Sequence, residues 1–333
     1  MTPYERLYNR MAGLPVDRVP NLNIFMALAA KQTGVSYREF VSDYKKLVAG
    51  VLWCQEAFDI DCYCVVSDPM REAEGFGAKV TLPEEGVPFS PVPLISDVED
   101  IASLKVIPAT SCQRMEDRLL AVRDLAERAK GDIPVIGWVE GAFAEACDLM
   151  SVAEVMYNLI DEPEAMHELL EICTQQAISF AKEQIACGAD MIGIGDAASS
   201  LIGADMYGEF VMPYQKRIID AVHEAGAKAK LHICGNMTQS LCHIANVGAD
   251  IVDCDHPVSM QKAAEILPES CAINGNTDPV AILNGTRESI YAEVEKLAGI
   301  CPKLIISAGC EIPRDTDPQH VKWMVEAINT LQP

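Results

Sequence analysis

The sequence predicts an α/β protein: a single (β/α)8 barrel of the TIM-barrel type over residues 1–333, with an insertion after strand 2. Short apolar runs alternate with longer helical patterns along almost the whole chain, which is typical of repeated strand–helix units around a parallel sheet. Eight such runs occur, and eight strands close this kind of barrel. The segments 185–190 and 244–250 also both pass through Gly-Ala-Asp into the next run, as expected where a helix leads into a strand.

Each predicted strand is a run of four to seven mainly apolar residues. In chain order the predicted strands are 19–25, 62–66, 134–139, 191–194, 228–233, 251–254, 271–274 and 304–307. The helices predicted between and after them include 115–130, 164–187, 207–225, 261–267, 287–299 and 319–331. Thr286 and the Thr316-Asp317-Pro318 sequence are typical of helix starts.

The stretch 72–108 interrupts this rhythm with three glycines and five prolines. It includes short β-like pieces such as 78–82. We therefore interpret it as the insertion after the second strand. Two structures fit this composition equally well: a hairpin that covers one mouth of the barrel, or an ordinary long surface loop.

Charge and composition exclude several functional classes. The chain has 49 acidic residues against 26 Lys and Arg, a net charge of −23, and half of its residues are apolar. Nucleic acid and anionic membrane surfaces are poor partners for so acidic a chain, and no stretch of 18 apolar residues occurs. The N-terminal residues lack the apolar run of a signal peptide, so we expect a cytoplasmic protein.

Thirteen cysteines are many for such a compartment, and the number is odd. In a reducing environment they should be thiols, which serve as small core residues or as metal ligands. We expect Cys54, Cys147, Cys173, Cys187 and Cys242 to belong to the core, because they lie on apolar or helical segments. Cys62 and Cys64 share a strand face, and a second metal pair there is conceivable.

Polar residues follow almost every predicted strand, where a barrel of this type builds its active site. The candidates, in chain order, are Asp68, Glu140, Asp196, His232, Cys234, Asn236, Asp255, His256, Asn276, Cys310 and Glu311. His232 and Cys234 are two residues apart and share one face of an extended strand, and both are preferred zinc ligands. Cys310 lies in a Gly-flanked turn and is the candidate third ligand. The alternative is a core cysteine beside a hydrogen-bonded histidine.

Several segments resemble the uroporphyrinogen decarboxylase superfamily. They are residues 6–20, Gly275-Asn276-Thr277-Asp278-Pro279, and Asp196 with the helix from 207 to 219. Within that superfamily, 231–235 together with 307–310 is similar to the zinc-dependent corrinoid methyltransferases. The resemblance covers essentially the whole chain. It implies a (β/α)8 barrel, a zinc ion held by His232, Cys234 and Cys310, and a corrinoid (cobalamin) presented by a separate corrinoid protein.

Two departures refine this resemblance. The first-strand segment of true decarboxylases carries arginines for the substrate carboxylates, whereas 21–30 contains no cation, so decarboxylation is not the expected reaction. The coenzyme M enzymes often have Gly-Cys-Gly in the last turn, where this chain has Gly309-Cys310-Glu311. Corrinoid-dependent demethylases have similar sequences. We therefore expect methyl transfer between cobalt and a small methyl ether or thiol, in a direction that the sequence leaves open.

The other strand-end residues receive provisional roles. Asp255 or Glu311 would complete the zinc coordination when substrate is absent, and His256 would act as an acid. Asp196 and Asp68 would orient the substrate or accept a proton, and the candidates for binding the substrate are Asp68, Glu140, Asn236 and Asn276. For each carboxylate the alternative is a purely structural cap on a barrel loop or a helix. The rival functions are a metal-free decarboxylase of another acid and a non-catalytic metal- or corrinoid-binding protein.

Overall fold

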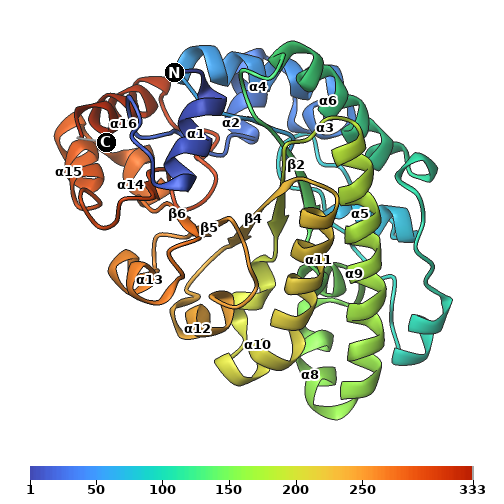
Figure 1. The fold of residues 1–333 in the computed structure, drawn as a ribbon. Helices are drawn as coiled ribbons and strands as arrows, with labels where there is room; N and C mark the ends of the chain where they lie inside the picture. The colour runs from blue at the N-terminus through green and yellow to red at the C-terminus, as the bar shows by residue number, and fades with distance from the viewer. Residues whose placement is uncertain (332–333) are drawn as a thin grey trace.

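A computed structural model describes residues 1–331, and its centre is a curled parallel sheet enclosed by helices (Figure 1). Seven strands form this sheet within the described residues, and they are hydrogen-bonded in chain order from β1 to β7. Their bounds are β1 Tyr63–Cys64, β2 Val135–Glu140, β3 Met191–Gly195, β4 Lys228–Ile233, β5 Ile251–Cys254, β6 Ala272–Asn274 and β7 Leu304–Ile305. The expected α/β barrel architecture is confirmed.

The prediction of an eighth regular strand at 19–25 is wrong. This segment lies between β7 and β1 and bonds to both sides, but it forms no ladder: Asp61 donates to the Asn21 carbonyl at 2.9 Å, and Ile312 donates to the Ile24 carbonyl at 3.0 Å. The side chain of Asn23 also accepts a hydrogen bond from the Ala308 amide at 2.8 Å. An asparagine side chain therefore replaces part of the backbone pairing that would close the barrel.

The helices lie outside the sheet and largely match the predicted stretches (Figure 1). Their bounds are α1 Pro3–Ala12, α2 Ala27–Thr33, α3 Tyr37–Ser42, α4 Tyr44–Phe58, α5 Met70–Phe76, α6 Gln113–Ala129, α7 Ala142–Met150, α8 Val152–Asp161, α9 Pro163–Ala186, α10 Ala204–Phe210, α11 Met212–Glu224, α12 Leu241–Ile244, α13 Met260–Ile266, α14 Pro279–Asn284, α15 Arg287–Glu295 and α16 Pro318–Thr330. The single helix predicted over 207–225 is in fact two helices, α10 and α11. They are separated at Val211, and Pro213 occupies the first turn of the second helix, where its missing N–H does not matter.

The irregular stretch begins later than predicted, because residues 70–76 form α5. Beyond this helix, Thr81 and Phe89 form an isolated antiparallel bridge. The turn between them contacts α3, which follows the 19–25 segment, and the loop that follows β7. Arg38 of α3 donates to the Leu82 carbonyl at 2.8 Å, and Arg314 of the loop pairs with Glu85 at 3.1 Å.

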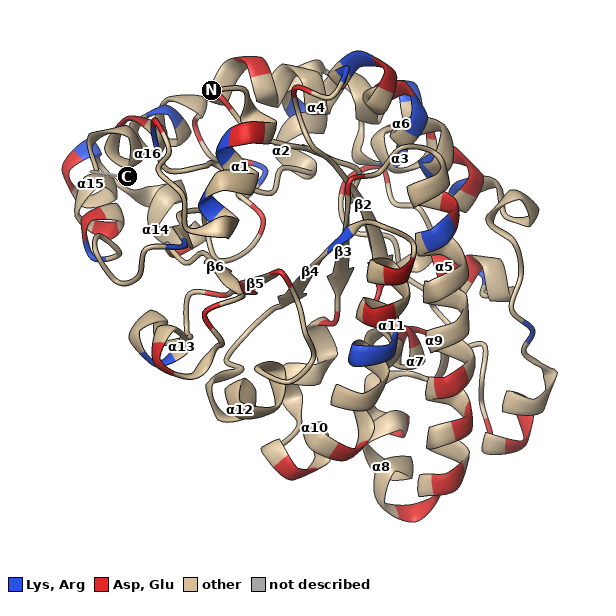
Figure 2. Ribbon diagram, in the orientation of Figure 1, with Lys and Arg blue, Asp and Glu red and all other residues tan. Residues whose placement is uncertain are grey.

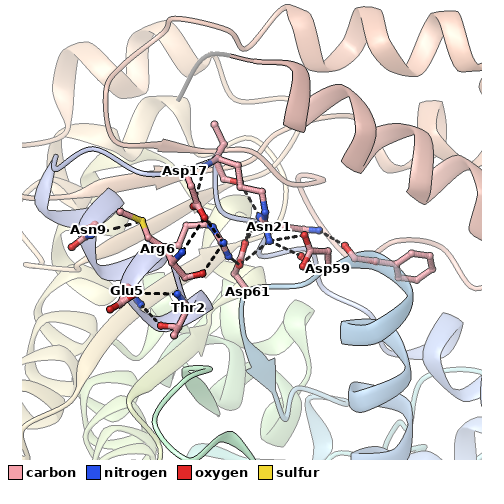
Figure 3. Close-up of polar contacts among 12 residues, drawn as sticks. Thr2, Glu5, Arg6, Asn9, Asp17, Asn21, Asp59 and Asp61 are labelled. Carbon is pink, nitrogen blue, oxygen red and sulfur yellow. Dashed lines mark hydrogen bonds and ion pairs between the residues drawn. The ribbon is translucent and has the colours of Figure 1, made fainter.

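A buried ion-pair network holds the irregular first segment against β1 (Figure 3). Asp61, which precedes β1, has no exposed surface and accepts hydrogen bonds from Arg6 at 2.5 Å, Arg18 at 2.6 Å and the Asn21 amide at 2.7 Å. Arg6 also pairs with Asp17 at 2.6 Å. The network therefore joins α1, residues 17–21 and β1 at the amino-terminal end of the barrel.

Acidic residues are spread over the outer helices, and Lys and Arg occur singly or in small groups among them (Figure 2). No helix in residues 1–331 is long and apolar enough to cross a membrane. All thirteen cysteines are free thiols. Cys54, Cys147 and Cys173 are buried as expected and Cys187 is partly buried, but Cys242 is exposed, so its assignment to the core is wrong.

Candidate metal centre

Three of the predicted residues meet at the carboxyl ends of the strands. His232 is the penultimate residue of β4, Cys234 follows that strand, and Cys310 lies in the turn beyond β7. The Nε2 atom of His232 lies 3.2 Å from the Cys234 sulfur and 3.9 Å from the Cys310 sulfur, and the two sulfurs are 3.7 Å apart. Within the described chain, these residues form a group whose ligand atoms all lie within 4.8 Å of one another.

These three separations match the edges of a tetrahedral zinc site. With Zn–S bonds of about 2.3 Å and Zn–N bonds of about 2.0 Å, tetrahedral angles place two sulfurs about 3.8 Å apart and a sulfur and a nitrogen about 3.6 Å apart. The observed sulfur–sulfur distance of 3.7 Å agrees, and the two nitrogen–sulfur distances, 3.2 and 3.9 Å, bracket the expected value. Two thiols and one imidazole also leave a fourth position open, as catalytic zinc sites do. The residues therefore fit zinc.

The second nitrogen of His232 faces a buried carboxylate. Its Nδ1 atom lies 3.4 Å from Asp253 of β5, which also pairs with Lys230 and accepts a hydrogen bond from Asn274 at 2.7 Å. Burial lowers the pKa of His232, but Asp253 and Cys310 outweigh burial and raise it to about 9. A carboxylate behind a histidine ligand fixes the ring orientation and leaves Nε2 directed toward the metal.

The two thiols polarise each other. A hydrogen bond from Cys234, helped by His232, lowers the pKa of Cys310 to about 4. The pKa of Cys234 is raised, first by its hydrogen bond to Cys310 and by burial, and further by the negative charges of Asp255 and Glu140. Cys310 is therefore the thiol that deprotonates first, and a bound cation would favour loss of the Cys234 proton as well.

Asp255 fixes the two turns that carry the cysteines. Its carboxylate accepts hydrogen bonds from the amides of Gly235 and His256, both at 2.6 Å. Gly309 packs so close that an added Cβ would lie 2.4 Å from the His256 nitrogen and 2.8 Å from the Asp255 carboxylate. Only glycine fits there. The structure thus places Asp255 as a support of the site, with both oxygens engaged by backbone amides.

Asp196 and Glu311 both lie at helix N-termini that lack a side-chain cap of their own. Asp196 is fully buried and accepts hydrogen bonds from the Ala144 amide in α7 and the Gln215 side chain, both at 2.8 Å. Glu311 accepts from the amide of Ala27, the first residue of α2, at 2.7 Å. Burial raises the pKa of Asp196 to about 6 and that of Glu311 to about 7. This geometry is that of the capping alternative.

The remaining predicted residues are distributed around this mouth. Asp68 pairs with Arg114. Asn276 is buried and donates to the Asp255 and Val258 carbonyls at 3.0 and 2.7 Å, so it supports a loop. Asn236 is exposed and accepts from the Thr238 amide, and the side chain of His256 is 46% exposed. Their predicted roles in substrate binding and acid catalysis stay predictions.

Glu140 ends β2 and belongs to a buried charged group that sequence reasoning missed. Its amide donates to Glu72 at 3.0 Å, and its carboxylate lies 3.6 Å from Arg71, both on α5. Glu145 and Asp148 of α7 belong to the same group. The available signal was two acidic residues three positions apart on a short, otherwise apolar helix that directly follows a strand.

Fold and site together define a parallel α/β barrel with a candidate catalytic metal centre of one histidine and two cysteines at the carboxyl ends of its strands. The chain belongs to the uroporphyrinogen decarboxylase (URO-D) family, whose model matches residues 2–331.

Two relatives and one solved structure show the range of proteins that this chain is similar to. It is 31% identical to the methylcobamide:CoM methyltransferase MtbA of Methanosarcina acetivorans, covering 99% of this chain and 98% of that relative. It is also 30% identical to a uroporphyrinogen decarboxylase of Anaeromyxobacter dehalogenans, covering 95% and 96%. A solved methyltransferase from Methanosarcina mazei has the same fold, with a TM-score of 0.90 at 23% identity and 98% coverage of both chains.

Proposed function

We propose that this protein is a zinc-dependent methyltransferase that moves a methyl group between the cobalt of a corrinoid carried by a partner protein and a small thiol or methyl ether. The observation that carries this proposal is the convergence of the ligand atoms of His232, Cys234 and Cys310, at separations that a tetrahedral zinc site would accept. The relatives named as methylcobamide:CoM methyltransferases support corrinoid-linked methyl transfer. We place the reaction in the reducing cytoplasm, where the two cysteines stay reduced.

Zinc, when bound by these residues, would act as a Lewis acid that holds a substrate thiol as its thiolate at neutral pH or polarises an ether oxygen. The residues of the chain then have separate tasks. His232, oriented by Asp253, would hold the metal through Nε2. Asp255 holds the Cys234 turn through the Gly235 amide and keeps the Cys310 turn close through its contact with Gly309.

Methyl transfer to a thiol balances without a further reactant. The thiol loses its proton to solvent, and its sulfur attacks the methyl carbon. A carbon–sulfur bond forms and the carbon–cobalt bond breaks. The bonding pair stays on the corrinoid, whose cobalt passes from Co(III) to Co(I). Demethylation of a methyl donor is the same exchange in the opposite direction.

The rival function within the family is decarboxylation. The 30% identity to a uroporphyrinogen decarboxylase means that this activity must be measured as well. A substrate with several carboxylates needs inward cations, yet residues 21–30, at the first-strand position, contain neither Lys nor Arg. The next residue, Lys31, is 41% exposed and pairs with Asp315 at 2.9 Å. These observations favour methyl transfer.

The decisive experiment measures metal and transfer on one preparation. Protein purified without chelator is analysed for zinc by mass spectrometry. It is then mixed anaerobically with methylcobalamin and a panel of small thiols, and with reduced cobalamin and a panel of methyl ethers, while the cobalt absorption bands are followed. About one zinc per chain and substrate-dependent cobalt spectra are expected. Decarboxylation of uroporphyrinogen by metal-free protein, with unchanged cobalamin spectra, would refute the proposal.

A further inference from the structure

A buried acidic cluster lies at the carboxyl end of β2, and no step described above uses it. It consists of Glu72 of α5, Glu140 of β2, and Glu145 and Asp148 of α7. Glu72 and Glu145 are each 2% exposed, and Glu140 is 7% exposed. Carboxylates are almost never buried at this level without a partner.

Within residues 1–331, four carboxylate oxygens of this cluster are buried without a hydrogen-bond partner. They are both carboxylate oxygens of Glu145, Oε2 of Glu72 and Oδ2 of Asp148. The only guanidinium placed against the cluster by an ion pair in that range is Arg71, which is fully buried. It lies 3.6 Å from Glu72 and Glu140, and none of its three nitrogens makes a hydrogen bond. Four carboxylates thus face one cation, and buried unsatisfied groups of this kind call for a missing partner.

The cluster adjoins the metal centre through Glu140. In the sheet register Glu140 pairs with Gly195, and Gly195 pairs with His232, so Glu140 and the metal ligand lie at the same level two strands apart. Two strand spacings correspond to about 10 Å between their Cα atoms. The intervening residue is Gly195, and the indole of Trp138 lies over it and beside His232.

We propose that the small molecule methylated or demethylated at the metal centre carries a positively charged nitrogen, which Glu140, Glu145 and Asp148 bind. This inference rests on the proposed function and names its substrate class. A cation would supply the partner that the carboxylates lack, and it would place the reacting sulfur or oxygen toward the metal ligands. An anionic head group, in contrast, would meet four carboxylates and only one arginine.

The protonation behaviour of the cluster agrees with this placement. Burial first, and then mutual repulsion, raises the pKa values of Glu140, Glu145 and Asp148 well above those of ordinary carboxyls. The charged or titratable groups that face these three from other elements are Asp68, Arg71, Glu72, Cys173 and Cys234. A bound cation takes the place of the protons that the cluster otherwise retains.

The test compares thiols that differ only in charge. Thiocholine and 3,3-dimethylbutane-1-thiol have the same shape, but only the first is a cation, and its quaternary nitrogen cannot bind zinc. Cysteamine and propane-1-thiol form a smaller pair, and 2-mercaptoethanesulfonate is the anionic probe. Binding to the zinc-loaded protein is measured by calorimetry, and methyl transfer from methylcobalamin is measured in parallel.

We expect the cationic member of at least one pair to bind about tenfold tighter than its neutral partner, the size of one charge-assisted contact. The anionic thiol should bind weakest. Glu145→Gln and Asp148→Asn should each reduce the preference, and Glu154→Gln, on the exposed face of α8, should leave it unchanged. Circular dichroism verifies that each variant is folded.

Three results would overturn the inference: equal binding within both pairs, tightest binding of the sulfonate, or a preference unchanged in both cluster variants. The sulfonate result would assign an anion site to Arg71. Failure of the proposed function gives a different pattern, because a charge preference in binding would then appear without methyl transfer to any thiol.

Discussion

Replacing Cys310 with alanine tests the metal centre most directly. Cys310 is the ligand most distant in sequence, 76 residues from Cys234 and 78 from His232, and its sulfur lies 3.7 and 3.9 Å from their ligand atoms. The substitution removes a single sulfur and leaves the other two ligands in place on one strand end. We expect the protein to remain folded and to lose its zinc.

The expected magnitude follows from the ligand count. Four-ligand zinc sites gain about 10–16 kcal/mol from binding at neutral pH, so one ligand contributes about 3 kcal/mol. Because 1.4 kcal/mol corresponds to a factor of ten, Cys310→Ala should weaken zinc binding by roughly a hundredfold or more. The match between the observed separations and tetrahedral edges means that the ligands need little rearrangement, so little of this contribution is offset.

The assay is competition with a fluorescent zinc chelator under anaerobic conditions, followed by methyl transfer from methylcobalamin. Cys242→Ala serves as the matched control, because Cys242 is an exposed thiol outside the triad. It should change neither zinc affinity nor activity. If Cys310→Ala bound zinc within threefold of the unmodified protein, the assignment of this residue as a ligand would be wrong.

Three further predictions concern groups around the site and the barrel. Asp253→Asn should weaken zinc binding by about 10- to 100-fold, because His232 loses the carboxylate that orients it, and chelator competition measures this loss. Asp61→Ala should lower the free energy of unfolding by about 3–5 kcal/mol in urea titrations, because it removes the buried carboxylate that Arg6 and Arg18 share and leaves Arg6 with only the partly exposed Asp17. Glu145→Gln should reduce the pH dependence of stability: burial and the neighbouring carboxylates raise the pKa of Glu145, so its protonated form stabilises the fold at low pH. That stability is lost as pH rises through the folded-state pKa, and urea midpoints at pH 5 and 8.5 should therefore differ less in the variant.

The first two of these predictions have matched control variants, and the third has outcomes that would contradict it. Asp250→Asn, at the opposite end of β5, should leave zinc affinity unchanged. Asp59→Ala removes a 59% exposed partner of Arg18 and should cost less than about 1 kcal/mol. A wild-type stability that rises between pH 5 and 8.5, or a Glu145→Gln slope identical to the wild type, would contradict the assigned burial of that carboxyl.

The convergence of His232, Cys234 and Cys310 and seven of the eight strands could be predicted from sequence, because both depend on local pattern. A strand end fixes where the next side chains point, so the His232-x-Cys234 spacing was sufficient to place both on one face. The last strand and its Gly-flanked turn then located Cys310. Both predictions rest on residues that are close together in the sequence, and their relative directions do not depend on the rest of the fold.

The remaining features depend on tertiary contacts that no local pattern encodes. In sequence, Asn23 is a polar residue within a mainly apolar predicted strand. In the fold, its side chain accepts the hydrogen bond from the Ala308 amide that a strand backbone would otherwise accept. Asp196 and Glu311 follow predicted strands as catalytic carboxylates do, but each lies against the N-terminus of a helix formed elsewhere in the chain. Arg71 lies on a helix, and only the folded chain places it among carboxylates from two other elements.

The irregular closure of the barrel has a consequence for metal retention. The seam between β7 and residues 19–25 lacks a regular ladder, and β7 itself has only two residues, so this is where local opening should cost least. A metal held by His232, Cys234 and Cys310 spans the mouth from β4 to the turn beyond that seam and joins positions 76 residues apart. A bound metal would therefore restrain the turn after β7, and the seam would open mainly when the metal dissociates. Amide exchange in residues 304–312 should slow in proportion to zinc occupancy.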